Sequence, residues 1–233
     1  MTQRSAIQSS LQPRWIDGDD AAPFSGKAVC IGRNYVAHIE ELNNPRPSEP
    51  LLFIKPATAL RPLSEPIHLP DHGDDCHFET ELTLLIGAPL SRATAEEAKK
   101  AVVGFGLALD LTLRDVQAVL KKKGLPWELA KGFDGACPVS RFVPASRIAD
   151  PQVLRYTLQV NGETRQQGDP TKMLWEMFEL TAHISRFFTL MPGDLILTGT
   201  PEGVSALVSG DHMQLTLHTV GGEILLEEQG RVV

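Results

Sequence analysis

The chain has 233 residues, of which 42% are hydrophobic and 22% charged, an ordinary balance for a globular protein with one full core. Its formal net charge of −7 argues against nucleic acid as the main partner, because phosphate binding requires a basic face. The most apolar segments, around 82–86 and 101–111, are broken by Gly, Asp or Glu, so neither is expected to span a membrane. Three scattered cysteines and a polar N-terminus without a signal-peptide pattern favour a cytoplasmic location.

Residues 1–26 show no sustained hydrophobic period, so we expect a peripheral N-terminal arm followed by one catalytic domain over residues 27–233. Hairpins are predicted at Asn161-Gly162 and Gly221-Gly222. The other predicted strands lie at 27–31, 51–54, 77–86, 102–109 and 195–198. Short helices are predicted at 34–42, with Asn34 as N-cap, at 94–101 and at 112–123, and one long helix at 171–190. Because short strands dominate, the pattern predicts a β-rich α+β fold rather than an open parallel sheet.

Three polar side chains alternate at the start of the predicted strand 77–86. Alternate side chains of a strand point the same way, so His77, Glu79 and Glu81 share one face. Two carboxylates on a buried face repel each other, and a bound cation would allow both to stay ionised. A solvent-facing polar stripe is the alternative that the spacing leaves open.

A further carboxylate, Asp110, ends the apolar run 104–109, where it faces a site or caps the next helix. If Asp110 joins Glu79 and Glu81, three carboxylates without a thiolate pattern favour a hard cation such as Mg²⁺ or Mn²⁺ over zinc.

Two further features carry possible chemistry. His38 and Glu41 lie three residues apart on a predicted helix and therefore on one face, where a carboxylate can orient an imidazole that acts as a general base. Surface pairs of this kind are also common. Lys131 lies between Trp127 and Phe133, whose rings could desolvate it, although an exposed lysine over apolar neighbours is the alternative.

These pieces, in this order, resemble the fumarylacetoacetate hydrolase family, in particular its short subgroup of acylpyruvate hydrolases and oxaloacetate decarboxylases. The resemblance covers roughly residues 27–230. Its motifs are residues 29–35 (VCIGRNY) with His38 and Glu41, 52–56 (LFIKP), 77–82 (HFETEL), 108–117 (ALDLTLRDVQ), 123–127 (KGLPW) with Ala130-Lys131, and 197–201 (LTGTP). One departure is Phe78, where close relatives often carry a second histidine.

The resemblance implies a mixed β-roll fold and a homodimer. It also implies a role for each matching residue. Glu79, Glu81 and Asp110 match the metal ligands, which usually hold Mg²⁺ or Mn²⁺. His38 and Glu41 match the dyad that activates water, and Lys131 matches a residue that contacts substrate oxygens and is expected to take part in catalysis. Gln117, Thr200 and Arg33 match further substrate contacts.

The expected activity is hydrolysis of a C–C bond in acylpyruvate-type 2,4-dioxo acids, such as fumarylpyruvate-like catabolic intermediates, with release of pyruvate. The alternative is an oxaloacetate decarboxylase, or an isomerase of unsaturated 2-oxo diacids, because all of these reactions pass through an enolate that a Lewis-acidic cation stabilises. A non-enzymatic protein that binds 2-oxo acids is the alternative from another class. The expected partner is thus a small 2-oxo acid, with no nucleic acid and no membrane.

Overall fold

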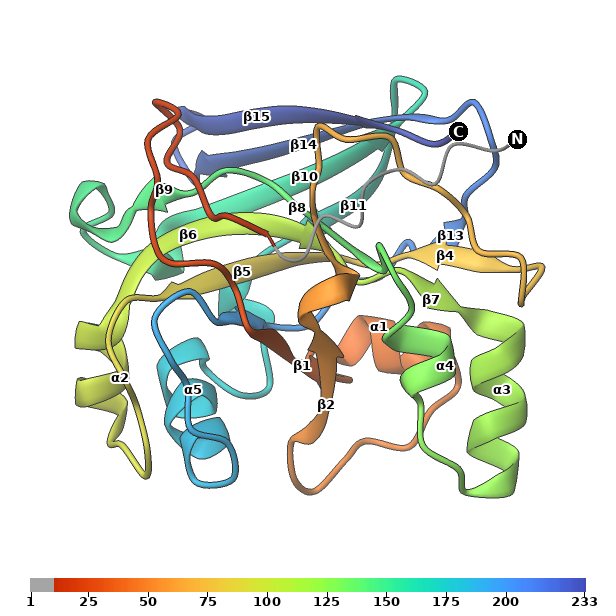
Figure 1. The fold of residues 1–233 in the computed structure, drawn as a ribbon, viewed down its shortest axis with the longest axis horizontal. Helices are drawn as coiled ribbons and strands as arrows, with labels where there is room; N and C mark the ends of the chain where they lie inside the picture. Colours follow the sequence, from red (N-terminus) through yellow and green to blue (C-terminus); the bar gives the residue numbers. More distant parts are fainter. Residues whose placement is uncertain (1–10) are drawn as a thin grey trace.

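The computed structural model describes residues 11–233, so residues 1–10 of the expected arm lie outside the described residues. Short strands dominate the described chain, and a strongly curved sheet runs through its middle (Figure 1). This large sheet has eight strands, in the order β2-β1-β12-β5-β6-β8-β3, with β9 paired to β6. Its strands are β1 (Lys27–Gly32), β2 (Leu51–Pro56), β3 (Leu60–Pro62), β5 (Thr80–Ile86), β6 (Val102–Leu109), β8 (Cys137–Val139), β9 (Val143–Pro144) and β12 (Leu195–Leu197).

A second sheet lies along one side of the large sheet (Figure 1). It has the order β11-β10-β14-β15 and comprises β10 (Leu154–Val160), β11 (Glu163–Gly168), β14 (His212–Thr219) and β15 (Ile224–Arg231). Every second residue of β10 is buried, as expected of a strand with one face on the core. A small third sheet joins β13 (Ser205–Ala206), β4 (Cys76–Phe78) and β7 (Thr112–Leu113). The predicted β-rich mixed fold is therefore confirmed.

The helices gather on the other side of the large sheet, with α2 and α5 together and α1, α3 and α4 near one another (Figure 1). They are α1 (Val36–Glu41), α2 (Ala95–Ala101), α3 (Arg114–Lys123), α4 (Glu128–Lys131) and α5 (Met177–Ser185).

The expected long helix at 171–190 is wrong. Helix α5 has nine residues, and the longest helix within residues 11–233 is α3, with ten. Leu174 fits the helical period of the sequence, but its backbone N–H donates to the carbonyl of Asn34 across the molecule. The Glu176 carboxylate then accepts hydrogen bonds from the next turn and starts the helix only there. Hydrophobic periodicity cannot show such a tertiary contact.

Three predicted boundaries also shift. Asn34 does not cap α1, because its side chain instead bonds the backbone of Trp175 and Thr198. Thr112 and Leu113 pair with β4, so the helix predicted from 112 begins at Arg114. The single strand predicted over 77–86 is interrupted at Glu79, which leaves β4 and β5 in different sheets.

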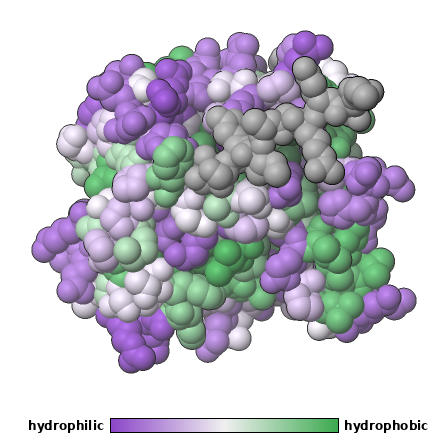
Figure 2. Space-filling model, in the orientation of Figure 1, coloured by the Kyte–Doolittle hydropathy of each residue, from purple (hydrophilic) through white to green (hydrophobic). Residues whose placement is uncertain are grey.

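Two clusters of buried apolar side chains form the core: the first joins residues of the large and second sheets with those of α5, and the second joins residues of the large sheet. Leu11 is buried in the second cluster, and Trp15 packs against it and pairs with Phe142 through a backbone bridge. Within residues 11–233 no helix combines the length and the apolar character needed to cross a bilayer. Polar residues cover much of the face in Figure 2, with an apolar area over α3 and α4, where Val119, Leu125 and Leu129 are exposed.

Candidate active site

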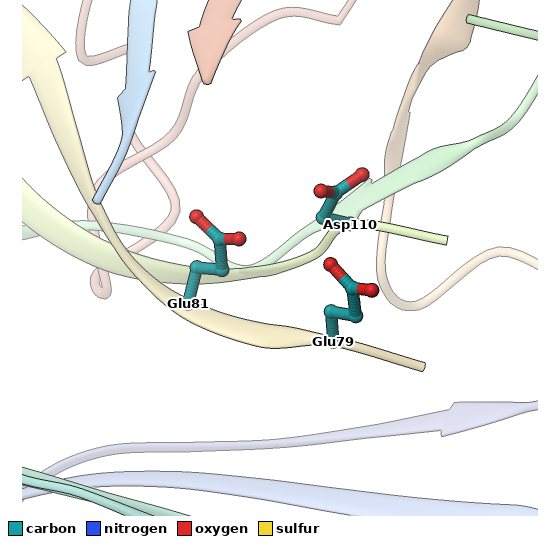
Figure 3. Close-up of side chains that lie close together, drawn as sticks. All are labelled: Glu79, Glu81 and Asp110. Carbon is teal, nitrogen blue, oxygen red and sulfur yellow. The ribbon is translucent and has the colours of Figure 1, made fainter. Parts of the chain in front are cut away.

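The end of the β5–β6 pair brings three carboxylates together. These strands are antiparallel, with Thr80 opposite Leu109, and the backbone N–H of Asp110 donates to the carbonyl of Glu79 at 2.8 Å. Glu79 and Asp110 therefore stand opposite each other just past the paired residues, and Glu81 follows on the same face of the strand. The three carboxylates lie close together (Figure 3), each offering an oxygen within 4.8 Å of the others. All three side chains are buried.

Three cations surround this triad of Glu79, Glu81 and Asp110. Lys131 Nζ donates to Glu79 Oε2 at 2.9 Å and to Asp110 Oδ2 at 2.6 Å. Arg114, in the first turn of α3, donates to Glu79. Lys55 Nζ, at the end of β2, lies 2.8 Å from Asp110 Oδ1. All of these contacts are made with Glu79 and Asp110.

The two glutamates of the triad have opposite electrostatic environments. Burial alone would raise the pKa of Glu79, but Lys131 and Arg114 outweigh it and hold that pKa below its usual range. Burial, reinforced by the negative charges of Asp110 and Glu79, raises the pKa of Glu81 well above its usual range. The Glu81 carboxylate accepts a hydrogen bond from the backbone N–H of Gly199, at 2.6 Å. Within residues 11–233, no cation forms an ion pair with Glu81, while Glu79 and Asp110 each have such partners.

The donor set fits a hard divalent cation. All the converging ligand atoms are carboxylate oxygens, which is the chemistry that Mg²⁺ and Mn²⁺ prefer. A dication between the three side chains would also offset the charge that disfavours ionised Glu81. The strand alternation predicted that His77 shares a face with Glu79 and Glu81. In the structure His77 is not part of the converging group, and its Nε2 pairs with Asp75 instead. Phe78 is buried in the apolar core, away from the ligand face.

The predicted dyad is formed on α1. His38 is buried, and its Nδ1 lies 3.3 Å from Glu41 Oε2. The other Glu41 oxygen accepts a hydrogen bond from the backbone N–H of Gly203 at 3.0 Å, so the carboxylate is held from two sides. Because a carboxylate only accepts, Nδ1 carries the proton, and Nε2 is left as the basic nitrogen of the neutral ring.

One pocket connects the dyad with the triad. Among the predicted site residues, the pocket is lined by Arg33, His38, Glu79, Glu81, Gln117, Lys131 and Thr200. The other two contact lining residues, since Glu41 pairs with His38 and Asp110 with Lys131. The structure therefore brings all nine predicted residues to one place.

The expected substrate contacts Thr200, Gln117 and Arg33 already have hydrogen-bond partners inside the protein. The Thr200 hydroxyl donates to the carbonyl of Thr80 at 3.0 Å and accepts from Gln166 at 2.8 Å, so it ties its loop to β5. Gln117 Oε1 accepts from Arg114 at 2.9 Å, which leaves its amide N–H₂ for a ligand. Arg33 has a backbone φ of 63°, an unusual conformation for a residue other than glycine.

Sequence reasoning missed several residues that build this site. Lys55 follows an apolar strand, and Arg114 lies four residues after Asp110 and three before Gln117, yet neither position was singled out. Phe53 was also missed, although Lys131 Nζ lies 5.0 Å from the centre of its ring. A lone lysine at the end of an apolar strand was the available signal for Lys55, because burial of that strand requires a partner for its charge.

Known proteins share both the sequence and this architecture. Residues 27–225 match the fumarylacetoacetate (FAA) hydrolase C-terminal family. The chain is 52% identical over 191 residues to "Oxaloacetate tautomerase YcgM" of Escherichia coli (strain K12), covering 82% of this chain and 87% of that protein. It is 44% identical over 190 residues to the human mitochondrial oxaloacetate tautomerase FAHD1, covering 82% and 86%.

A solved structure extends the likeness to the fold. The crystal structure of fumarylpyruvate hydrolase from Pseudomonas aeruginosa, in complex with Mn²⁺ and pyruvate, has a TM-score of 0.88 and 34% identity, covering 100% of this chain and 99% of that chain. The motifs, the extent of the match and the shared fold agree. The chain belongs to the fumarylacetoacetate hydrolase family.

Proposed function

We propose that this protein is a metal-dependent enzyme that interconverts the keto and enol forms of oxaloacetate. The observation that carries the proposal is that His38 lines the same pocket as the triad residues Glu79 and Glu81, in a chain that is similar over most of its length to oxaloacetate tautomerases. The hydrolase expected from the motifs becomes the second candidate, because the curated relatives named above carry out a reaction that needs no water. Mg²⁺ or Mn²⁺ is the proposed cation.

The reaction moves one proton between C3 and the oxygen on C2. A divalent cation held by Glu79, Glu81 and Asp110 would supply a Lewis acid that favours negative charge on the 2-oxo oxygen. His38 Nε2 takes the proton from C3, and the C–H electron pair becomes the C2–C3 double bond. The electrons of the C2–O π bond move to the oxygen, which then accepts the proton that His38 Nε2 took from C3, so the imidazole becomes neutral again. Enol to ketone is the reverse sequence.

The surrounding residues prepare this proton transfer. Glu41 keeps the proton on Nδ1 and favours the imidazolium that forms when Nε2 accepts a proton. Burial alone would lower the pKa of Lys131, but Asp110 and Glu79 outweigh it and raise that pKa, so Lys131 stays protonated. Lys131 can therefore donate a hydrogen bond to the developing oxyanion.

Hydrolysis of acylpyruvates is the second candidate, and the same dyad favours it. His38 would then take a proton from water rather than from C3, and the hydroxide would add to the distal carbonyl before the C–C bond breaks. The fold shared with a fumarylpyruvate hydrolase that holds Mn²⁺ and pyruvate supports this reading.

Product analysis separates the candidates. Purified protein with added Mg²⁺ or Mn²⁺ would be given oxaloacetate enol, oxaloacetate and a series of acylpyruvates, against metal-only controls. We expect rapid ketonisation of the enol and slower or absent release of CO₂ or pyruvate. Preferential cleavage of an acylpyruvate would reverse the order of the two candidates. Preferential release of CO₂ from oxaloacetate would assign a decarboxylase instead.

A further inference from the structure

Two positively charged side chains, Arg33 and Lys121, line the pocket and do not pair with the carboxylates of the triad. Arg33 Nη2 and Lys121 Nζ each donate to Asn44 Oδ1, at 3.0 Å in both cases. Both cations and Asn44 line the same pocket as His38. Their common acceptor is a neutral amide oxygen, so it satisfies hydrogen bonds without neutralising charge. Within residues 11–233, neither cation is ion-paired with a carboxylate, in a protein whose net charge is −7.

The two cations are close enough to repel each other. Nitrogens that share one acceptor at 3.0 Å each are at most 6.0 Å apart. Burial, followed by the positive charges of Arg33 and Arg114, lowers the pKa of Lys121, although Glu79 acts in the opposite direction. Glu79 is already paired with Lys131 and Arg114. An anion between the two side chains would turn this repulsion into attraction.

Helix α3 places Lys121 in line with the inner site. Arg114, Gln117 and Lys121 are separated by three and four residues, so they follow one face of the helix. Arg114 contacts the triad residue Glu79, and Gln117 contacts Arg114. Lys121 is one turn beyond Gln117, about 6 Å further along the axis. This step suits a short ligand with one end at the triad and the other end at the pocket mouth.

Arg33, which directly follows strand β1, reaches the same acceptor with an unusual backbone conformation. Its φ of 63° is in the left-handed region, which residues other than glycine seldom adopt. Strain of this kind persists where the surroundings fix a conformation, and it is frequent where side chains meet ligands. The Arg33 side chain is also partly buried, and this burial lowers its pKa.

We propose that Lys121 and Arg33 form a clamp for the second carboxylate of a 2-oxo dicarboxylic acid, with Asn44 Oδ1 holding the two cations together when no substrate is bound. This inference rests on the proposed function of the pocket and specifies its substrate class. The 2-oxo acid end of the substrate belongs near the triad, and the distal carboxylate binds at the pocket mouth. The clamp therefore selects four-carbon diacids over 2-oxo acids with an uncharged tail.

Two substrates that differ only at the distal carboxyl group, which is a carboxylate in one and an uncharged methyl ester in the other, test the clamp. Oxaloacetate enol and the enol of its 4-methyl ester would be assayed with excess Mg²⁺, using wild type, Lys121→Met and Lys122→Met. Lys122 is the adjacent exposed residue of the same helix, so its replacement matches the change in net charge. We expect Lys121→Met to raise KM for oxaloacetate about 10- to 100-fold, the worth of one charged hydrogen bond, and to change KM for the ester less than about 3-fold. Lys122→Met should alter neither.

A second variant, Asn44→Asp, separates substrate binding from simple structural support. It places a fixed carboxylate between the two cations, so it should raise the melting temperature and raise KM for oxaloacetate while sparing the ester. Lys121→Arg should restore most of the selectivity lost in Lys121→Met. Equal effects of Lys121→Met on both substrates, or no effect on either, would overturn the clamp, as would Asn44→Asp with unchanged selectivity.

The clamp can also be judged if the proposed function fails. Should the wild type turn over neither enol, equilibrium binding of oxaloacetate and of pyruvate, which lacks the distal carboxylate, replaces kinetics. Tighter binding of oxaloacetate that is lost in Lys121→Met would retain the clamp without the tautomerase activity. Equal affinities for oxaloacetate in wild type and Lys121→Met would overturn it.

Discussion

Lys55 and Asp110 form a fully buried ion pair, in which Lys55 Nζ lies 2.8 Å from Asp110 Oδ1. The same ammonium also donates to the carbonyl oxygens of Leu111, Ala136 and Lys131. Lys55 thus ties strand β2 to Asp110, which directly follows β6, and to Lys131 at the end of helix α4. It both compensates a triad charge and satisfies buried backbone acceptors.

Replacement of Lys55 should therefore cost stability and make the protein depend more on metal. Lys55→Met leaves the Asp110 charge and three carbonyls without this partner, and loss of one member of a buried pair typically costs about 3–5 kcal/mol. Because a dication can compensate Asp110, Mn²⁺ should raise the melting temperature more in Lys55→Met than in wild type. Thermal unfolding with and without Mn²⁺ checks this. Lys100→Met, which removes an exposed pair with Glu96, is the control and should change little.

The two glutamates of the triad should respond to neutralisation in opposite directions. Glu81 has a raised pKa, so in the metal-free protein Glu81→Gln removes an unfavourable charge and should raise the melting temperature at pH 8. Glu79 has a lowered pKa and pairs with Lys131 and Arg114, so Glu79→Gln should lower the melting temperature. Both variants should lose Mn²⁺ affinity, measured by calorimetric titration. Destabilisation of the metal-free protein by both variants would contradict this account.

The pH dependence of the Glu81→Gln effect follows from the sign of the shift. Below the usual pKa of a glutamate, Glu81 is protonated in both folded and unfolded protein, so its ionisation costs no stability. As pH rises toward the raised folded pKa, the unfolded chain ionises first and wild-type stability falls. The difference in melting temperature between Glu81→Gln and wild type should therefore grow with pH. A difference that shrinks as pH rises would show that ionised Glu81 is favoured in the fold.

Removal of the proposed base should affect chemistry without affecting the metal. We expect His38→Ala to slow ketonisation of oxaloacetate enol, and any acylpyruvate hydrolysis, by about 10²–10⁴-fold, the usual contribution of a general base. Mn²⁺ affinity should be unchanged, and decarboxylation of oxaloacetate, which needs no proton acceptor, should be comparatively spared. Stopped-flow assays with each substrate check this. Equal loss of every activity with metal still bound would show that His38 does not act as the general base.

Much of the site could be predicted because its parts are local in sequence. The alternation of Glu79 and Glu81 predicts that both lie on one face of a strand. The three-residue spacing of His38 and Glu41 predicts that both lie on one face of a helix. Their convergence with Asp110 depends on the antiparallel register of β5 and β6, which no local pattern encodes. The resemblance to a family supplied that contact.

The missed features are those that long-range contacts decide. Lys55 is fixed by acceptors 56 to 81 residues away, and the Leu174 backbone bonds Asn34 instead of continuing a helix. Asn44 joins Arg33 to a lysine 77 residues further on. The expected homodimer and the domain boundary at residue 26 stay predictions, which sedimentation of the full chain and limited proteolysis would check.

The most direct test of the central claim is the rate of ketonisation of oxaloacetate enol as Mg²⁺ or Mn²⁺ is titrated into metal-free wild-type protein. The account predicts a saturable, metal-dependent acceleration above the rate with metal alone, and no such acceleration when Asp110→Asn is titrated in parallel. An equal rate with and without protein across the titration, or full activity in the metal-free protein, would contradict it.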